Sequence, residues 1–230
     1  MPDATTIQSL RDWAVEYNDP VWFETDPIIF PKEFLNRGAS LRDIETAAVF
    51  AAHFAWGRRS MIVRDCERFF DFLEWKPYDY VISGDWRDDQ SSIHRTVKWS
   101  DTAAICGRLR DFYLRNESLE VLSVKEIREK IYGAGIDASA PDKKIRMMKR
   151  WMVRDDGKVD LGLWKHSSKQ DLLIPLDVHV HRQALELGLT SRRTRDIRTC
   201  MEITDIFRDI FPGDPALGDF ALFGYGVSHA

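Results

Sequence analysis

The residues best suited to chemistry lie in residues 174–182, with the sequence Ile-Pro-Leu-Asp-Val-His-Val-His-Arg. Asp177 follows an apolar run and precedes a helical pattern that closes at Gly188. An aspartate in this position accepts hydrogen bonds from the first free amides of a helix, which holds its carboxylate in a fixed direction. If the protein does chemistry, we expect it to centre on this carboxylate. The simpler explanation is that Asp177 only caps a helix.

Two histidines directly follow Asp177 and raise the alternative of a metal site. A His-x-His pair at the end of an early strand binds metal in some barrel enzymes, but such a barrel needs far more than the 49 residues that follow His181. On a helix, the side chains of His179 and His181 would point in different directions. We therefore expect no metal and no cofactor, and we expect His179 to support its neighbours rather than bind a ligand.

Helical spacing of apolar residues dominates the rest of the chain and predicts a mainly α-helical protein. Ser40 and Ser100 are expected to cap two of the helices. Two prolines in residues 26–31 predict a buried, non-helical connection, and residues 76–101 show no clear pattern. The remaining expected helices cover residues 6–17, 60–73, 124–132, 142–153, 178–187, 191–211 and 215–225.

Cysteine content and hydropathy indicate the compartment. Cys66, Cys106 and Cys200 are widely spaced and odd in number, so they form neither a disulfide framework nor a Cys-x-x-Cys cluster site. The N-terminus lacks a basic segment followed by an apolar run, and nowhere do about 18 apolar residues follow one another. We expect a cytoplasmic protein that does not span a membrane.

Positive charge is concentrated in residues 142–200, although the whole chain carries a net charge of -4. This region has 14 lysines and arginines against 8 acidic residues, which gives +6 and leaves -10 for the remainder. Such a region is either an ordinary solvated surface or the contact surface for an anionic partner.

Two strings resemble the helix-hairpin-helix DNA glycosylases. Residues 176–182, Leu-Asp-Val-His-Val-His-Arg, followed by Leu-Gly-Leu at 187–189, resemble their V-D-T-H-[VI]-x-R and L-G-L signature. Residues 219–226, Asp-Phe-Ala-Leu-Phe-Gly-Tyr-Gly, are similar to the last core helix of that superfamily. The chain also resembles an uncharacterised bacterial family, through strings at residues 26–31, 51–59, 150–164 and 175–182.

The glycosylase resemblance implies a catalytic role for Asp177. In that superfamily the aspartate of this motif stabilises the cationic sugar as the base leaves, or deprotonates the attacking nucleophile. Bifunctional members also use a lysine that attacks the sugar C1′ and forms a Schiff base. Residues 143–153 resemble the helix after their hairpin, so Lys143 is the candidate. The implied reaction removes a damaged base from DNA, with AP lyase cleavage through Lys143.

The resemblance also implies where duplex or single-stranded DNA would bind. Basic side chains hold phosphates, and the candidates are Lys144, Lys149, Arg150, Arg182, Arg192 and Arg193. Base chemistry requires the nucleotide to leave the duplex and enter an aromatic pocket, for which Trp151 and Trp164 are candidates. Since the chain has eight tryptophans, core packing is the alternative explanation for both.

The implied fold is an all-α, two-lobed helix-hairpin-helix glycosylase-like unit covering residues 1–230. Its lobe boundary is expected near 116–124, and residues 120–230 carry the hairpin-like and Asp177 motifs beside a cleft. One alternative is a non-catalytic nucleic-acid-binding protein of the same fold, which is favoured by the absence of an L-P-G-V-G hairpin string. Another is an enzyme acting on free nucleosides, which the modest net charge permits. An enzyme acting on DNA would be associated with the nucleoid.

Overall fold

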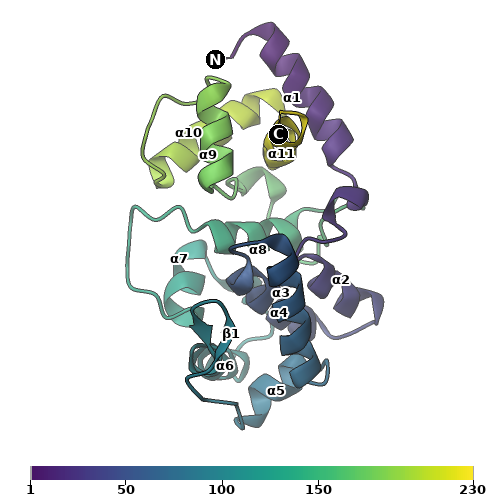
Figure 1. Ribbon diagram of the computed structural model, residues 1–230, viewed down its shortest axis with the longest axis vertical. Coiled ribbons are helices and arrows are strands. Elements are labelled where there is room, and N and C mark those ends of the chain that lie inside the picture. Colours follow the sequence, from purple (N-terminus) through teal and green to yellow (C-terminus); the bar gives the residue numbers. More distant parts are fainter. Residues whose placement is uncertain (1, 230) are drawn as a thin grey trace. The chain divides into compact units, whose positions relative to one another are not determined.

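The computed structural model describes residues 2–229 and consists mainly of helices (Figure 1). Within these residues there are eleven α-helices and one two-stranded antiparallel hairpin, so the helical prediction is confirmed. The chain forms two compact units, which we call unit 1 (residues 2–22 and 137–229) and unit 2 (residues 23–136). The sequence predicts one boundary near 116–124, whereas the chain passes between units after residues 22 and 136. The first helix joins the C-terminal unit through tertiary contacts that no local pattern reveals.

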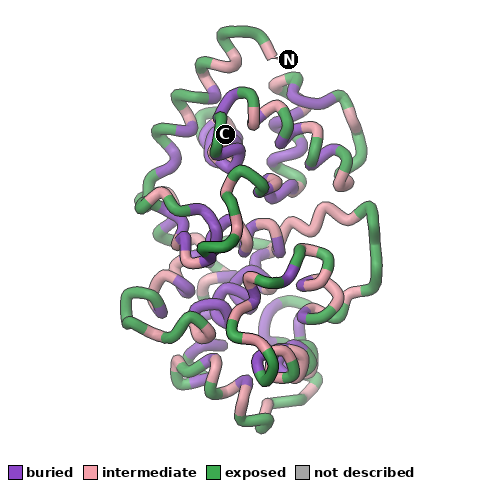
Figure 2. The backbone as a smooth tube through the Cα atoms, turned by 180° about the vertical axis from the view of Figure 1, so that it is seen from behind, coloured by how far each residue is buried: buried purple, intermediate pink, exposed green. Residues whose placement is uncertain are grey.

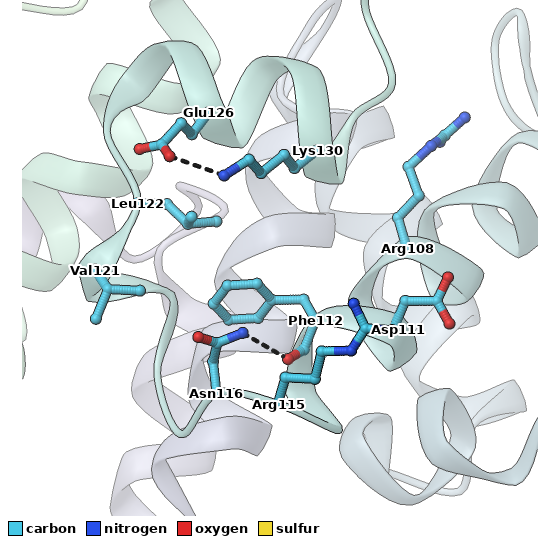
Figure 3. Close-up of a pocket in the computed structure, with 9 residues that line it drawn as sticks. All are labelled: Arg108, Asp111, Phe112, Arg115, Asn116, Val121, Leu122, Glu126 and Lys130. Atoms are coloured by element: carbon cyan, nitrogen blue, oxygen red, sulfur yellow. Dashed lines mark hydrogen bonds and ion pairs between the residues drawn. The ribbon is translucent and has the colours of Figure 1, made fainter.

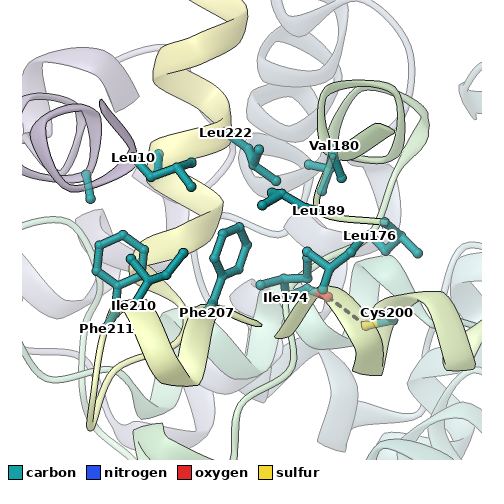
Figure 4. Packing of buried hydrophobic residues seen from close by; sticks show 14 residues of the cluster. Leu10, Ile174, Leu176, Val180, Leu189, Cys200, Phe207, Ile210, Phe211 and Leu222 are labelled. Atoms are coloured by element: carbon teal, nitrogen blue, oxygen red, sulfur yellow. Dashed lines mark hydrogen bonds between the residues drawn. The ribbon is translucent and has the colours of Figure 1, made fainter. Parts of the chain in front are cut away.

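Unit 1 is built around its last helix, α11, which lies against α1 and α9 (Figure 1). Leu10, Val180, Phe207 and Leu222, contributed by four different helices, meet in its buried core (Figure 4). Burial of each such side chain contributes about 1.5–3 kcal/mol to folding. The elements of unit 1 are α1 (Ala4–Tyr17), η1 (Pro20–Phe23, which crosses the unit boundary), α8 (Lys143–Val153), η4 (Lys169–Asp171), α9 (Val178–Glu186), α10 (Ile197–Ile210) and α11 (Leu217–Ser228).

Two glycines let α11 approach its neighbours closely. A Cβ atom on Gly218 would lie 2.1 Å from Cδ2 of Phe207, and one on Gly224 would lie 2.3 Å from Cδ2 of Tyr17. These distances are far below van der Waals contact, so any larger residue would force the helices apart. Close packing against α1 therefore explains why glycine occupies position 224 in the string at residues 219–226.

Unit 2 contains the aromatic core formed by Phe50, Phe54, Phe69 and Phe70. Most buried residues belong to the helices, whereas many residues of the connecting loops are exposed (Figure 2). The predicted capping of α3 by Ser40 is confirmed, because the Ser40 hydroxyl accepts a hydrogen bond from the Asp43 amide. The elements of unit 2 are α2 (Ile29–Asn36), α3 (Leu41–Phe54), α4 (Arg59–Phe72), α5 (Pro77–Ser83), β1 (Ser92–His94), β2 (Val97–Lys98), α6 (Trp99–Tyr113), η2 (Leu119–Val121), α7 (Val124–Glu126) and the π-helical η3 (Ile127–Ile131).

Three local predictions are wrong. Residues 26–31 are not wholly a loop, because α2 begins at Ile29 and Pro31 lies in its first turn, where a missing N–H costs nothing. Ser100 does not cap α6, since that helix begins at Trp99 and the Asp101 carboxylate accepts from the Lys98 amide. The helix expected over residues 191–211 begins only at Ile197, where Asp196 caps it.

The patternless residues 76–101 contain α5 and the β1–β2 hairpin. Strands this short are too brief to show a clear alternation of apolar and polar residues. Across residues 2–229, no helix combines the length and apolar character needed to cross a membrane.

Candidate functional site

Asp177 caps α9, as the sequence predicts. Its Oδ1 atom accepts hydrogen bonds from the backbone amides of His179 and Val180, both at 2.9 Å. These two bonds hold Oδ1 of the carboxylate at the start of the helix. Its other oxygen, Oδ2, lies 4.0 Å from Nζ of Lys143. One oxygen therefore anchors the helix while the second faces an amine.

Lys143 is the first residue of α8 and precedes Asp177 by 34 residues, so only the tertiary fold brings the two together. Asp142, just before it, has a left-handed backbone (φ 48°), a conformation that recurs at functional sites. The side chains of Lys143 and Asp177 are 29% and 33% exposed. An ion pair this open contributes roughly 0–1 kcal/mol to folding, so stability gives little reason for the pairing. Both groups remain within reach of a ligand.

Lys144 adds a second amine at the start of α8. Burial, and then the positive charge of Lys143, lower its pKa from 10.5 to about 8. An amine attacks carbon only in its neutral form, so a lowered pKa increases the fraction of the reactive species near neutral pH. Sequence reasoning assigned Lys144 to phosphate binding alone. The lowered pKa depends on burial, which the sequence does not report.

Asp219 is a group near this site that sequence reasoning missed. It lies in the first turn of α11, its side chain is 13% exposed, and it accepts a hydrogen bond from Nη1 of Arg150. Burial raises the pKa of Asp219 to about 6; the charge of Arg150 opposes the rise and that of Asp177 adds to it. Asp177 and Lys143 both influence Asp219 electrostatically, so these three ionisable groups form one cluster. The only sequence signal was its place in the string at 219–226.

The raised pKa of Asp219 predicts a specific dependence of stability on pH. Between about pH 4 and pH 6 the folded protein keeps this proton while the unfolded chain releases it. The stabilisation that protonated Asp219 contributes to the folded protein is therefore complete below pH 4 and is lost as the pH rises through 6. As the pH rises from 4 to 6, the free energy of unfolding of the wild type should fall by roughly 1–3 kcal/mol relative to that of Asp219→Asn. Urea unfolding of both proteins from pH 4 to 7 measures it, and parallel curves would contradict the prediction.

Arg150, a predicted phosphate contact, is instead a buried residue, only 5% exposed. Its Nε donates to Oδ1 of Asp160 at 3.2 Å, and its Nη1 donates to Asp219. Buried charges require such partners, and an arginine committed to two carboxylates is not available to a phosphate at the surface. The prediction for Arg150 is therefore corrected to a role in positioning Asp219.

Trp151 and Trp164 lie in the interior of unit 1, where they are 0% and 1% exposed. Neither ring has a face open to an incoming base, so the arrangement favours core packing over the predicted base pocket. Lys149 is half-buried, and its Nζ lies 5.3 Å from the ring centre of Trp164. The Lys149 ammonium therefore covers the ring from outside, in cation–π contact.

The segment at residues 190–198 is hydrogen-bonded both to α9 and to the loop that precedes α8. Nε2 of His181 donates to the Arg192 carbonyl at 2.8 Å, and the Ile197 amide donates to the Ser139 carbonyl at 2.9 Å. The loop before Lys143 is thereby tied to this segment. The guanidinium of Arg192 is paired with Asp196 at 2.8 Å, which limits its role as a phosphate contact.

Three other arginines on this segment are exposed and form no ion pair with any residue from 2 to 229: Arg193, Arg195 and Arg198. Arg182 on α9 is also exposed, by 64% of its side chain, and its Nε lies 3.7 Å from Oε1 of Glu186.

His179 is exposed as well. We expected His179 to support its neighbours, but it is His181 whose ring forms a hydrogen bond with the neighbouring segment. Within the described part of the chain, no three His, Cys, Asp or Glu side chains are grouped to hold a metal ion.

Comparison with known proteins gives one match. A family described as "Protein of unknown function (DUF2400)" matches residues 26–134 and 128–228, which together span most of the chain. Neither the curated proteins nor the solved structures give a match.

Proposed function

The chain belongs to the DUF2400 family, and we propose that its unit 1 removes a damaged base from DNA and cleaves the resulting abasic site. The observation that carries this proposal is the Lys143–Asp177 pair, an amine and a carboxylate 4.0 Å apart and both partly exposed. The pairing matches the two groups that a bifunctional glycosylase needs. The two-lobed helix-hairpin-helix glycosylase-like fold is part of the same proposal.

Asp177 would act through Oδ2, the oxygen that its helix-capping bonds leave facing the amine. When the bond between sugar and base breaks, positive charge develops on the sugar ring, and a fixed carboxylate stabilises it. The same oxygen can accept a proton from the Lys143 ammonium, which frees the nitrogen lone pair.

Lys143 would use that lone pair to form a bond to C1′ while the glycosidic bond breaks, and the departing base, which keeps the electron pair, would take up the proton held by Asp177. A proton would then pass from the nitrogen to the ring oxygen as the ring opens, which gives a protonated Schiff base between the nitrogen and C1′. The Asp177 carboxylate, ionised again, would accept a proton from C2′, and departure of the 3′ phosphate with the electrons of its C–O bond would cleave the strand. Hydrolysis of the Schiff base returns the amine. No cofactor takes part in this sequence.

The phosphates of DNA would be held by Arg193, Arg195 and Arg198, because these side chains are exposed and not engaged in ion pairs with residues 2–229. Their segment is tied both to α9, which Asp177 caps, and to the loop that precedes Lys143. A strand bound there would lie near the Lys143–Asp177 pair. Either duplex or single-stranded DNA is consistent with this arrangement.

The test is incubation with oligonucleotides that carry abasic, oxidised, deaminated or alkylated sites, followed by borohydride reduction. We expect a covalent adduct with the wild type and none with Lys143→Gln, because only an amine forms the reducible Schiff base. Lys165→Gln is the matched control, since Lys165 is an exposed lysine of unit 1 paired with Asp155 at 2.8 Å. An adduct that survives in Lys143→Gln would exclude Lys143 as the nucleophile.

A second candidate is a nucleic-acid-binding protein without catalysis, which the three exposed arginines also favour. It predicts no base release on any lesion, together with DNA binding that weakens as salt concentration rises. That combination in the same set of oligonucleotides would leave Asp177 as a helix cap and replace the enzyme proposal.

A further inference from the structure

Unit 2 contains a pocket of about 510 Å³ that is unconnected with the proposed chemistry of unit 1 (Figure 3). Its lining comes from the end of α6, the η2 turn and the helical segment formed by α7 and η3. Its volume lies within the range of roughly 300–1,000 Å³ that is typical of small-molecule sites.

One wall of the pocket is apolar. The ring of Phe112 lies opposite Leu122 and near Val121, which is 69% exposed (Figure 3). Phe112 is only half-buried, although a fully packed core would cover such a ring. A planar apolar body placed against it would remove this surface from water and could stack on the ring face.

The charged groups around this wall differ in their availability. Lys130 is paired with Glu126 at 2.8 Å, and Arg108 donates to the Ala104 carbonyl at 3.3 Å. Arg115, one turn after Phe112, is exposed and its side chain has no hydrogen bond or ion pair with residues 2–229. A guanidinium presents a planar fork that matches a carboxylate or phosphate.

A second polar group at the pocket is Asp111, which is exposed. A carboxylate accepts hydrogen bonds, so this side chain suits a ligand N–H or O–H and not a second anion. The pocket therefore offers three complementary features: an apolar ring surface, one available cation and one acceptor.

From these features we propose that the pocket in unit 2 binds a small molecule that carries both an aromatic ring and an anionic group. The ring packs against Phe112, the anion pairs with Arg115, and a donor on the ligand reaches Asp111. A nucleoside monophosphate and an aromatic carboxylate both have this chemistry.

Calorimetric titration of the full chain at fixed ionic strength tests the proposal, with adenosine 5′-monophosphate and indole-3-acetate as probes. We expect saturable binding of at least one probe. Its uncharged counterpart, adenosine or indole-3-acetamide, should bind at least roughly ten times more weakly. Binding of the nucleotide alone identifies a phosphate ligand, and binding of indole-3-acetate alone identifies a carboxylate ligand.

Arg115→Met should weaken binding of the anionic probe roughly tenfold, because it removes the charge but keeps the length of the side chain. Val121→Asp, at an exposed position of the apolar wall, should weaken it as well by repelling the anion. Arg58→Met is the matched control, since Arg58 is an exposed arginine of unit 2 outside the pocket. The proposal is overturned if neither probe binds, or if Arg115→Met and Val121→Asp both bind like the wild type.

Discussion

Replacement of Asp177 by asparagine is expected to lower the rate of base release by roughly 10²–10⁴-fold and to leave the stability of the protein nearly unchanged. Asparagine caps helices about as well as aspartate, so the bonds from the His179 and Val180 amides would be kept. It carries no negative charge, however, and can neither stabilise a sugar cation nor accept a proton from Lys143. Single-turnover kinetics and thermal unfolding of the same preparation measure the two effects.

Asp177→Ala is the matched variant for the structural role. It removes both the charge and the cap, so it should destabilise the protein by about 1 kcal/mol in addition to the loss of activity. The difference between the two variants separates capping from catalysis. If Asp177→Asn released bases at the wild-type rate, the carboxylate would have only its capping function.

Replacement of Arg154 by methionine is expected to lower the free energy of unfolding by roughly 3–5 kcal/mol, the largest effect on stability that we predict. Arg154 is 0% exposed and lies among three carboxylates. Its Nη1 is 2.7 Å from Asp156 and 3.1 Å from Asp160, and its Nε is 2.9 Å from Asp214. Methionine has a similar length, so the loss would reflect the uncompensated carboxylates more than a cavity.

Urea unfolding measures this loss, and Lys165→Met is the control because it breaks an exposed ion pair and should cost less than about 1 kcal/mol. Burial already raises the pKa of Asp160 and of Asp214 despite the neighbouring arginine. Without Arg154 both carboxyls should take up protons at still higher pH. The stability deficit should therefore narrow as the pH falls, and a deficit below 1 kcal/mol at pH 7 would refute this account.

Most of the helices and several of their ends could be predicted from local sequence, because these depend on residues within one or two turns. The caps at Ser40 and Asp177 were predictable for this reason, since each side chain bonds to amides two or three residues ahead. The sequence also singled out Asp177 and Lys143, through the resemblance of the strings around them. A proline is compatible both with a loop and with the first turn of a helix, and more than one residue near the start of a helix can cap it. The local pattern therefore misplaced the helix boundaries near Pro31 and Ser100.

The side chains that surround Asp177, and the burial of each of them, could not be predicted locally and depend on the tertiary fold. Arg150 and Lys149 look alike as basic residues on one helix, yet Arg150 is enclosed by Asp160 and Asp219 while Lys149 lies half-exposed over Trp164. The raised pKa of Asp219 likewise depends on burial and on charges far away in the sequence. Solvent exclusion and Coulomb interactions act between residues that are close in space, and the sequence specifies that closeness only through the complete fold.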